Sequence, residues 1–413
     1  MFSAITKRVD KIILSDIEIV DLQYDQLFKP MLICLKLVGN TPTLKKRPRW
    51  IVHNFFFIGI YFFFFCFVIY SIIFYDAHND IANLIANVSY CAIGVVISLK
   101  NFTMIKYRTT YYNLMTTVKA DYSKASELSS EDQLILIDYA KRGKLAVDIW
   151  AYITVLYTAS SVLIPLLIMG YYYMFDEFKF ITTIIITLPP AFDQVNSFFK
   201  YFFMAILTDY LIIFSDLTYV STVPQGLIYM LHACGRIDIL KRKVLSLFSA
   251  ENPDQLHVHR SMRVIAKELQ DIYEFVGFIN TFSKLFYEVT LAMSSVVFPI
   301  SAILILEGLK QGSLKIDLVN LTIGVFALVG IPCYYGNLLV DKSMELREAV
   351  YFCNWERVWN RSARTSLIIL MTRMERAICI HSVFQVLNLE ALADTMKTSY
   401  RLFSLINAVQ VFD

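Results

Sequence analysis

The hydrophobic residues of this chain gather in long windows that are separated by more polar connections. Each window is close to the ~20 residues that a helix needs to cross the hydrocarbon core of a bilayer. The windows cover residues 51–75, 81–103, 145–169, 195–217, 285–306 and 317–340. They predict six transmembrane helices. The first, which is rich in Phe, is hydrophobic on every face, as expected of a helix surrounded by lipid.

The last stretch, Asn388 to Val411, is long enough for a seventh span but is far more polar. A membrane helix with this many polar groups usually faces a protein interior or a water-filled path. In its final turns Leu402, Leu405 and Val409 share one face at helical spacing. Several copies around an axis would form a polar pore with a narrow apolar ring, which gates by dewetting. The alternative is a seventh helix that only packs against the others.

Composition supports a membrane protein. Hydrophobic residues make up 57% of the 413 residues and charged residues only 18%, which excludes an ordinary soluble domain. The first residues are charged and amphipathic, so we expect no cleavable signal peptide. We therefore predict an all-α membrane protein that forms a single domain over residues 1–413.

Basic residues alternate from one connection to the next, and this alternation predicts the orientation. Lys and Arg are abundant in segments 1–50, 104–144, 218–284 and 341–387. They are scarce in segments 76–80, 170–194 and 307–316. Basic connections stay in the cytoplasm, so we expect a cytoplasmic N-terminus and an extracellular C-terminus. A G-protein-coupled receptor has the opposite orientation, which argues against the most familiar seven-helix interpretation.

The cytoplasmic segments keep helical patterns beyond the membrane windows. Ser129 with Asp132 marks a plausible helix start inside 104–144. We expect the helices to continue into a cytoplasmic anchor, with 341–387 as its last helix and turn before the terminal helix at 388–411. In segment 1–50, the apolar run from Phe28 to Val38 is too short to span. It is re-entrant, interfacial or simply buried.

A ligand pocket is predicted in the outer half of the second, third and fourth spans, under an apolar loop that follows the third. An exposed apolar loop must bury itself, and a lid over the helix ends would achieve this. Small hydroxyl residues on one face of the third span indicate either helix packing or a cavity wall. The candidate ligand contacts are Asn87, Val88, Tyr157, Ser160, Ile164, Phe199 and Phe203.

The sequence gives little evidence of disulfide, metal or catalytic sites. The seven cysteines lie mostly in spans or cytoplasmic segments, so they suggest no disulfide framework. His257 and His259 lack clustered metal ligands and are interpreted as solvated. The sequence holds no phosphate-binding loop, dinucleotide fingerprint or nucleophile elbow. We therefore predict no enzyme activity, cofactor, metal or nucleic-acid partner.

Several short motifs, taken in order, resemble those of the insect odorant receptor family. They are Leu35 to Gly39, Phe192-Asp193, Tyr334 to Asn337 with Trp355, Met371 to Arg373 with Arg376, Asn388 to Glu390, and Lys397 to Leu405. Each motif alone is weak. Their order and spacing across the whole chain, together with the inverted orientation, make the resemblance specific.

The resemblance implies a ligand-gated, non-selective cation channel in the plasma membrane of sensory dendrites. In this family an odour-tuned subunit that binds a small volatile ligand assembles with a common co-receptor into a tetramer. The co-receptor's long insertion between helices four and five is absent here, which favours the tuned subunit. The resemblance also places the gate at Leu402, Leu405 and Val409 and subunit contacts in segment 342–376 and the terminal helix.

Three other classes stay open. A gustatory-receptor-type channel is the first alternative, although Thr398-Ser399-Tyr400 departs from the Thr-Tyr pattern of that family. A seven-helix metabotropic receptor and a transporter are the others. The transporter has less support because the sequence shows no inverted repeat.

Overall fold

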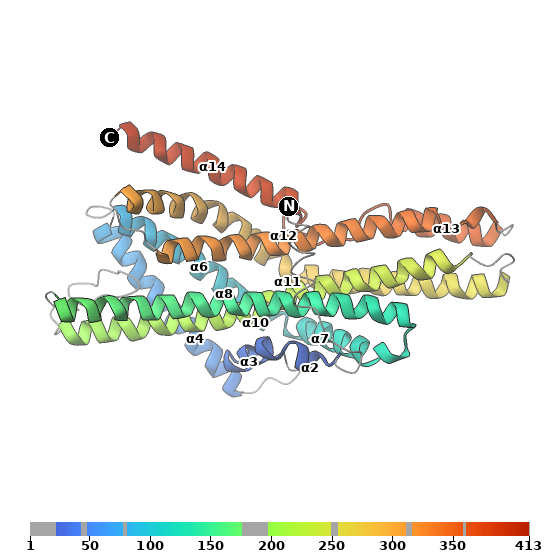
Figure 1. Cartoon of the computed structure of the whole chain (residues 1–413), viewed down its shortest axis with the longest axis horizontal. Coiled ribbons are helices and arrows are strands. Elements are labelled where there is room, and N and C mark those ends of the chain that lie inside the picture. The colour runs from blue at the N-terminus through green and yellow to red at the C-terminus, as the bar shows by residue number, and fades with distance from the viewer. Residues whose placement is uncertain are drawn as a thin grey trace.

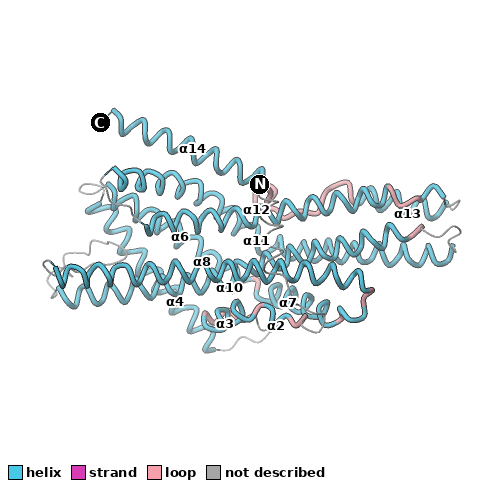
Figure 2. The backbone as a smooth tube through the Cα atoms, viewed as in Figure 1, coloured by secondary structure: helices cyan, strands magenta, loops and turns pink. Residues whose placement is uncertain are grey.

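The computed structural model describes residues 22–42, 48–76, 81–175, 197–248, 255–310, 316–357 and 361–412. Helices form almost all of this part of the chain (Figures 1 and 2), and its only β-type contact is an isolated bridge between His381 and Val386. The all-α class predicted from the sequence is confirmed.

The described helices follow one another in chain order. The first ones are α2 (Tyr24–Leu27), α3 (Lys29–Leu37), α4 (Pro48–Ser71, continued by a π-helical turn at Ile72–Asp76), α6 (Ile81–Lys106) and α7 (Arg108–Ser123). Four long helices come next: α8 (Ser130–Phe175), α10 (Ser197–Ser246), α11 (Gln255–Lys310) and α12 (Ile316–Tyr351). The last two are α13 (Arg361–Arg373) and α14 (Leu389–Phe412).

Each of the six apolar windows falls on one of these helices. Within the described residues, α6, α8, α10, α11 and α12 are long and apolar enough to cross a membrane, and the apolar segment Ile58–Phe74 of α4 is shorter. On α4 the side chains of Phe55 and Phe62 are both 71% exposed, as suits contact with lipid. The chain is therefore a multi-pass membrane protein.

The four long helices lie lengthwise in the molecule, and its two ends differ (Figure 1). At one end, which we call the core end, α3, α7 and α13 join them and a large apolar core forms. At the other, the span end, α4 and α6 join them. Helix α10 passes through the core end with residues 220–235 all buried.

The short helix α3 belongs to the core. Phe28, Met31 and Leu35 are fully buried, and the helix packs against α8 and α10. Full burial of one such side chain contributes roughly 1.5–3 kcal/mol. One face of this apolar run is therefore packed into the protein, while Ile33 and Leu37 on it are exposed.

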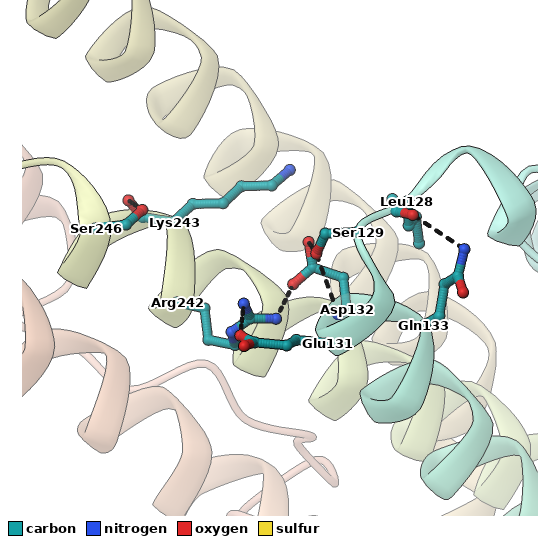
Figure 3. Close-up of polar contacts among 8 residues, drawn as sticks. All are labelled: Leu128, Ser129, Glu131, Asp132, Gln133, Arg242, Lys243 and Ser246. Carbon is teal, nitrogen blue, oxygen red and sulfur yellow. Dashed lines mark hydrogen bonds and ion pairs between the residues drawn. The ribbon is translucent and has the colours of Figure 1, made fainter.

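The predicted helix start at Ser129 is confirmed (Figure 3). The Ser129 hydroxyl accepts a hydrogen bond from the Asp132 backbone N–H at 3.3 Å and donates one to Asp132 Oδ2 at 2.8 Å, which caps α8. Arg242, near the end of α10, pairs with Asp132 at 2.7 Å and with Glu131. Capping and ion pairing together fix the first turn of α8 against α10.

The segment between α13 and α14, residues 374–388, is held by hydrogen bonds to α11 and α12; we call it the base linker. Ser343 of α12 accepts a hydrogen bond from the Ile378 N–H at 2.8 Å. On α11, Asn280 accepts one from the His381 N–H at 2.8 Å, and Glu288 accepts one from the Val383 N–H at 3.1 Å. The base of α14 is therefore fixed to α11 and α12.

One close approach completes this attachment. A Cβ atom on Gly336 of α12 would lie 2.1 Å from the carbonyl oxygen of Leu387, a distance that no side chain tolerates. Asn388 then caps α14 by accepting a hydrogen bond from the Ala391 N–H at 2.9 Å. Beyond its first half α14 leaves the bundle, and its free end stands apart from the other helices in Figure 1.

We expect Gly336→Ala to destabilise the protein. The added methyl group displaces the base linker, and overpacking of this kind costs roughly 1–3 kcal/mol. Thermal unfolding of the purified protein in detergent measures the loss. Gly330→Ala is the matched control, because its Cβ would meet only the Phe326 ring, at 3.7 Å. Equal melting temperatures for the two variants would show that the close approach is unimportant.

Candidate functional site

A cavity lies between six helices of the span end. The space between its walls, together with the solvent at its opening, has a volume of about 1220 Å³. The wall is mostly apolar and aromatic. It includes Tyr61, Phe64 and Phe65 of α4; Tyr90, Ile93 and Ile97 of α6; Trp150, Ile153, Thr154 and Tyr157 of α8; Leu211, Ser215, Asp216 and Tyr219 of α10; Met293 and Val297 of α11; and Asn320, Gly324 and Leu328 of α12.

The depth of the cavity follows from where these residues stand in their helices. On α8 the wall runs from Trp150 to Tyr157, and on α10 from Leu211 to Tyr219. These stretches lie toward the core end of the predicted third and fourth spans, whereas the α4 and α6 contributions come from mid-span. The cavity is therefore in the middle of the spans, deeper than the outer-half pocket predicted from the sequence.

A few polar groups interrupt the apolar wall. The Tyr61 hydroxyl is hydrogen-bonded to that of Ser215. The carboxyl group of Asp216, a residue that is only 8% exposed, accepts a hydrogen bond from Thr158 of α8. The indole N–H of Trp150 is buried and has no hydrogen-bond partner in the described part of the chain. The cavity thus offers a large apolar surface with a small number of fixed hydrogen-bonding groups.

The residues predicted to contact ligand fall in different places. Tyr157 lines the cavity, and Ser160 borders it by accepting a hydrogen bond from Asn320 Nδ2 at 3.3 Å. Asn87 is buried, while Val88 and Ile164 are half-buried; none of the three lies in the cavity wall. Phe199 and Phe203 are 65% and 43% exposed on α10.

The apolar loop predicted as a lid lies outside the described residues for most of its length, from 176 to 196.

The sequence reasoning missed Asp216, Trp150 and the contributions of α4, α11 and α12. One signal was available: Asp216 is a carboxyl group inside a predicted span, and ionisable residues in membrane spans usually mark functional sites. For the apolar residues there was no such signal, because a helix that is apolar all round shows no difference between a cavity face and a lipid face.

The predicted gate residues lie on α14, which is only partly covered. Its first half packs on α11 and α12 and buries Ala391, Thr395 and Ser399. In its second half Leu402 is half-buried and Leu405 is 62% exposed, whereas the Val409 side chain lies outside the described residues. One copy of the chain therefore leaves an apolar surface of this helix uncovered.

In the described ranges, no three His, Cys, Asp or Glu side chains gather as metal ligands would. All seven cysteines are free thiols.

The fold and the cavity define a multi-pass helical membrane protein with an apolar cavity among its spans. Comparison with known families makes this specific: the model of the family described as 7tm Odorant receptor matches residues 80–400. The chain belongs to the odorant receptor family, which confirms the resemblance read from its motifs. No curated protein sequence matches this chain.

Solved structures agree on the fold. The chain is similar to the insect olfactory receptor OR5 from Machilis hrabei in complex with eugenol, with a TM-score of 0.78 and 15% identity over 93% of this chain and 98% of that one. It is also similar to a structure of OR5 described without eugenol, with a TM-score of 0.76 and 14% identity over 92% and 97% of the two chains.

Proposed function

We propose that this protein is the odour-tuned subunit of a ligand-gated, non-selective cation channel, and that its ligand binds in the mid-span cavity. The observation that carries the proposal is structural: two helices of the cavity wall, α11 and α12, also hold the base linker of α14. A ligand that moves these helices acts directly on the helix that would line the pore. The eugenol complex of OR5 supports a small organic ligand.

The lining determines how such a ligand binds. A small volatile molecule offers few hydrogen bonds, so burial of apolar surface at ~25 cal/mol per Å² supplies most of its affinity. Tyr157, Trp150 and Phe64 provide the aromatic part of the wall, which favours flat or branched apolar groups. Specificity then comes from the shape of the cavity and from its few polar groups.

The arrangement of helix ends supports the topology of seven spans with a cytoplasmic N-terminus. In Figure 1 the free end of α14 lies at the same end of the bundle as the end of α8, the start of α10 and the junction of α11 with α12. These are the connections with few basic residues. The core end carries the basic connections and would stand in the cytoplasm. The terminal helix would be the seventh span.

Assembly with a co-receptor would cover the exposed polar side of α14. Lys397 and Asp394 form an exposed ion pair at 2.9 Å, and Arg401 is exposed as well. A charged side chain at mid-bilayer costs roughly 2.5–3.5 kcal/mol on an insertion scale. Neighbouring subunits around a wet axis would remove this cost, with further contacts through segment 342–376. The plasma membrane of a sensory neuron is the expected location.

We expect Gly324→Leu to weaken ligand activation. Gly324 lines the cavity, and a Cβ there would meet no atom within 4 Å, so the larger side chain fills space that a ligand would use. Dose–response currents should shift by at least about ten-fold, which corresponds to 1.4 kcal/mol of lost binding. Gly170→Leu is the control, since Gly170 has equal space but lies outside the cavity. Equal dose responses for the two variants would place the ligand elsewhere.

The gate is tested by polar substitution. Leu405→Ser and Val409→Ser should wet the apolar ring and raise the resting current, because a hydrophobic constriction conducts once water fills it. Whole-cell current without ligand measures the effect, with surface expression as the normalisation. Unchanged resting current and unchanged permeation in both variants would contradict a gate at this position.

Dependence on a partner is tested by expression. The chain alone should give no ligand-gated current, and co-expression with a family co-receptor should give cation current. Deletion of residues 402–413 should abolish the current while the chain is still expressed. Large ligand-evoked currents from the chain alone, in cells that lack a co-receptor, would point instead to a self-sufficient homomeric channel.

A further inference from the structure

The carboxyl group of Asp216 is unusual in its surroundings. It lies in the cavity wall, in the middle of a multi-pass membrane protein, and the residue is only 8% exposed. Thr158 donates a hydrogen bond to its Oδ2 atom. Among the described residues, no Lys, Arg or His forms an ion pair with it and no side chain donates to Oδ1.

An acid in such a place is costly to the protein. A buried carboxylate without a partner destabilises a fold by several kcal/mol unless it takes up a proton and becomes neutral. Packing alone does not explain the carboxyl group of Asp216, because an apolar side chain of similar size would fill the cavity wall without this cost. A carboxyl group kept under these conditions is explained by a partner that arrives with the ligand.

The neighbours of Asp216 favour a cation. Tyr61, Tyr219 and Trp150 line the same cavity, and an aromatic ring whose face meets an ammonium group attracts it by roughly 0.5–2 kcal/mol. The hydroxyl of Ser215, the residue before Asp216, is hydrogen-bonded to the hydroxyl of Tyr61. These two hydroxyls therefore do not compensate the charge of the Asp216 carboxylate. The remaining wall is apolar and suits a hydrocarbon tail.

We propose that the cavity recognises small protonated amines with one apolar tail, and that the ammonium group pairs with the Asp216 carboxylate. This inference rests on the proposed function, since it names the ligand class of the same cavity. The indole N–H of Trp150 is the competing group: it would favour a neutral ligand with a hydroxyl or carbonyl oxygen. Amines and alcohols of equal shape therefore separate the two possibilities.

The test uses two matched pairs, 2-phenylethylamine with 2-phenylethanol and hexylamine with hexan-1-ol. Binding to the purified full-length chain in lipid nanodiscs is measured directly, and ligand-evoked current is measured with a co-receptor present. Each amine should bind more tightly than its alcohol by roughly ten-fold or more, as expected for a hydrogen bond to a charged group at about 1.5–3 kcal/mol. This comparison needs no variant.

Variants then assign the preference to one residue. Asp216→Asn should reduce the affinity for each amine, relative to that for its matched alcohol, roughly ten- to a hundred-fold, whereas Asp216→Glu should retain the preference for amines. Asp209→Asn is the control, because Asp209 is on the same helix but outside the cavity. Thr158→Val is a second test that leaves the carboxyl group in place; it should preserve the preference for amines.

The two proposals fail in different ways. Alcohols that bind as tightly as amines, or an amine preference that persists in Asp216→Asn, would overturn the role of Asp216 while currents evoked by either ligand class still supported the channel. Selective amine binding without any current would support the Asp216 site and reject the channel.

Discussion

The structure depends on the complete burial of the middle of α10. Residues 220–235 have no exposed face, so other helices must surround this stretch, and α3, α8, α11 and α12 do so. Such close packing needs small side chains, as at Gly235, where a Cβ would lie 3.1 Å from the Tyr139 ring. Dense interiors do not deform gradually, so α10 acts as a fixed axis at the core end. The positions of the long helices are set there.

The cavity is a consequence of this arrangement. The same helices that converge on α10 at the core end also enclose the cavity at the span end, where α4 and α6 take the places of α3, α7 and α13. The base linker attaches to α11 and α12, through Asn280 and Ser343 among others. Motion of these two helices at the cavity would therefore be transmitted to the base of α14, because the core end does not give way.

The sequence predicted the features that depend on local pattern. Apolar windows located the helices of the spans, and Ser129 with Asp132 located the start of α8, because capping needs only neighbouring residues. It was harder to predict which face of each helix lines the cavity and which faces lipid. Phe199 and Phe203, which were predicted to contact ligand, are exposed on α10 in the described part of the chain. In an almost wholly apolar helix, periodicity does not separate a lipid face from a cavity face. Asp216 carried a signal because a carboxyl group is rare in such a helix.

Helix α14 shows which parts of a receptor of this kind are positioned by contacts within one copy of the chain. Its first half is fixed by Ser399 and other buried residues, but Tyr400 and Leu405 are 70% and 62% exposed. A helix held at one end has its other end positioned by whatever it meets there. In the channel that we propose, these contacts come from neighbouring subunits, and closed rings require matching surfaces. A tuned subunit that changes its cavity can keep the same base linker and the same α14, so ligand specificity varies while the gate stays compatible with its partner.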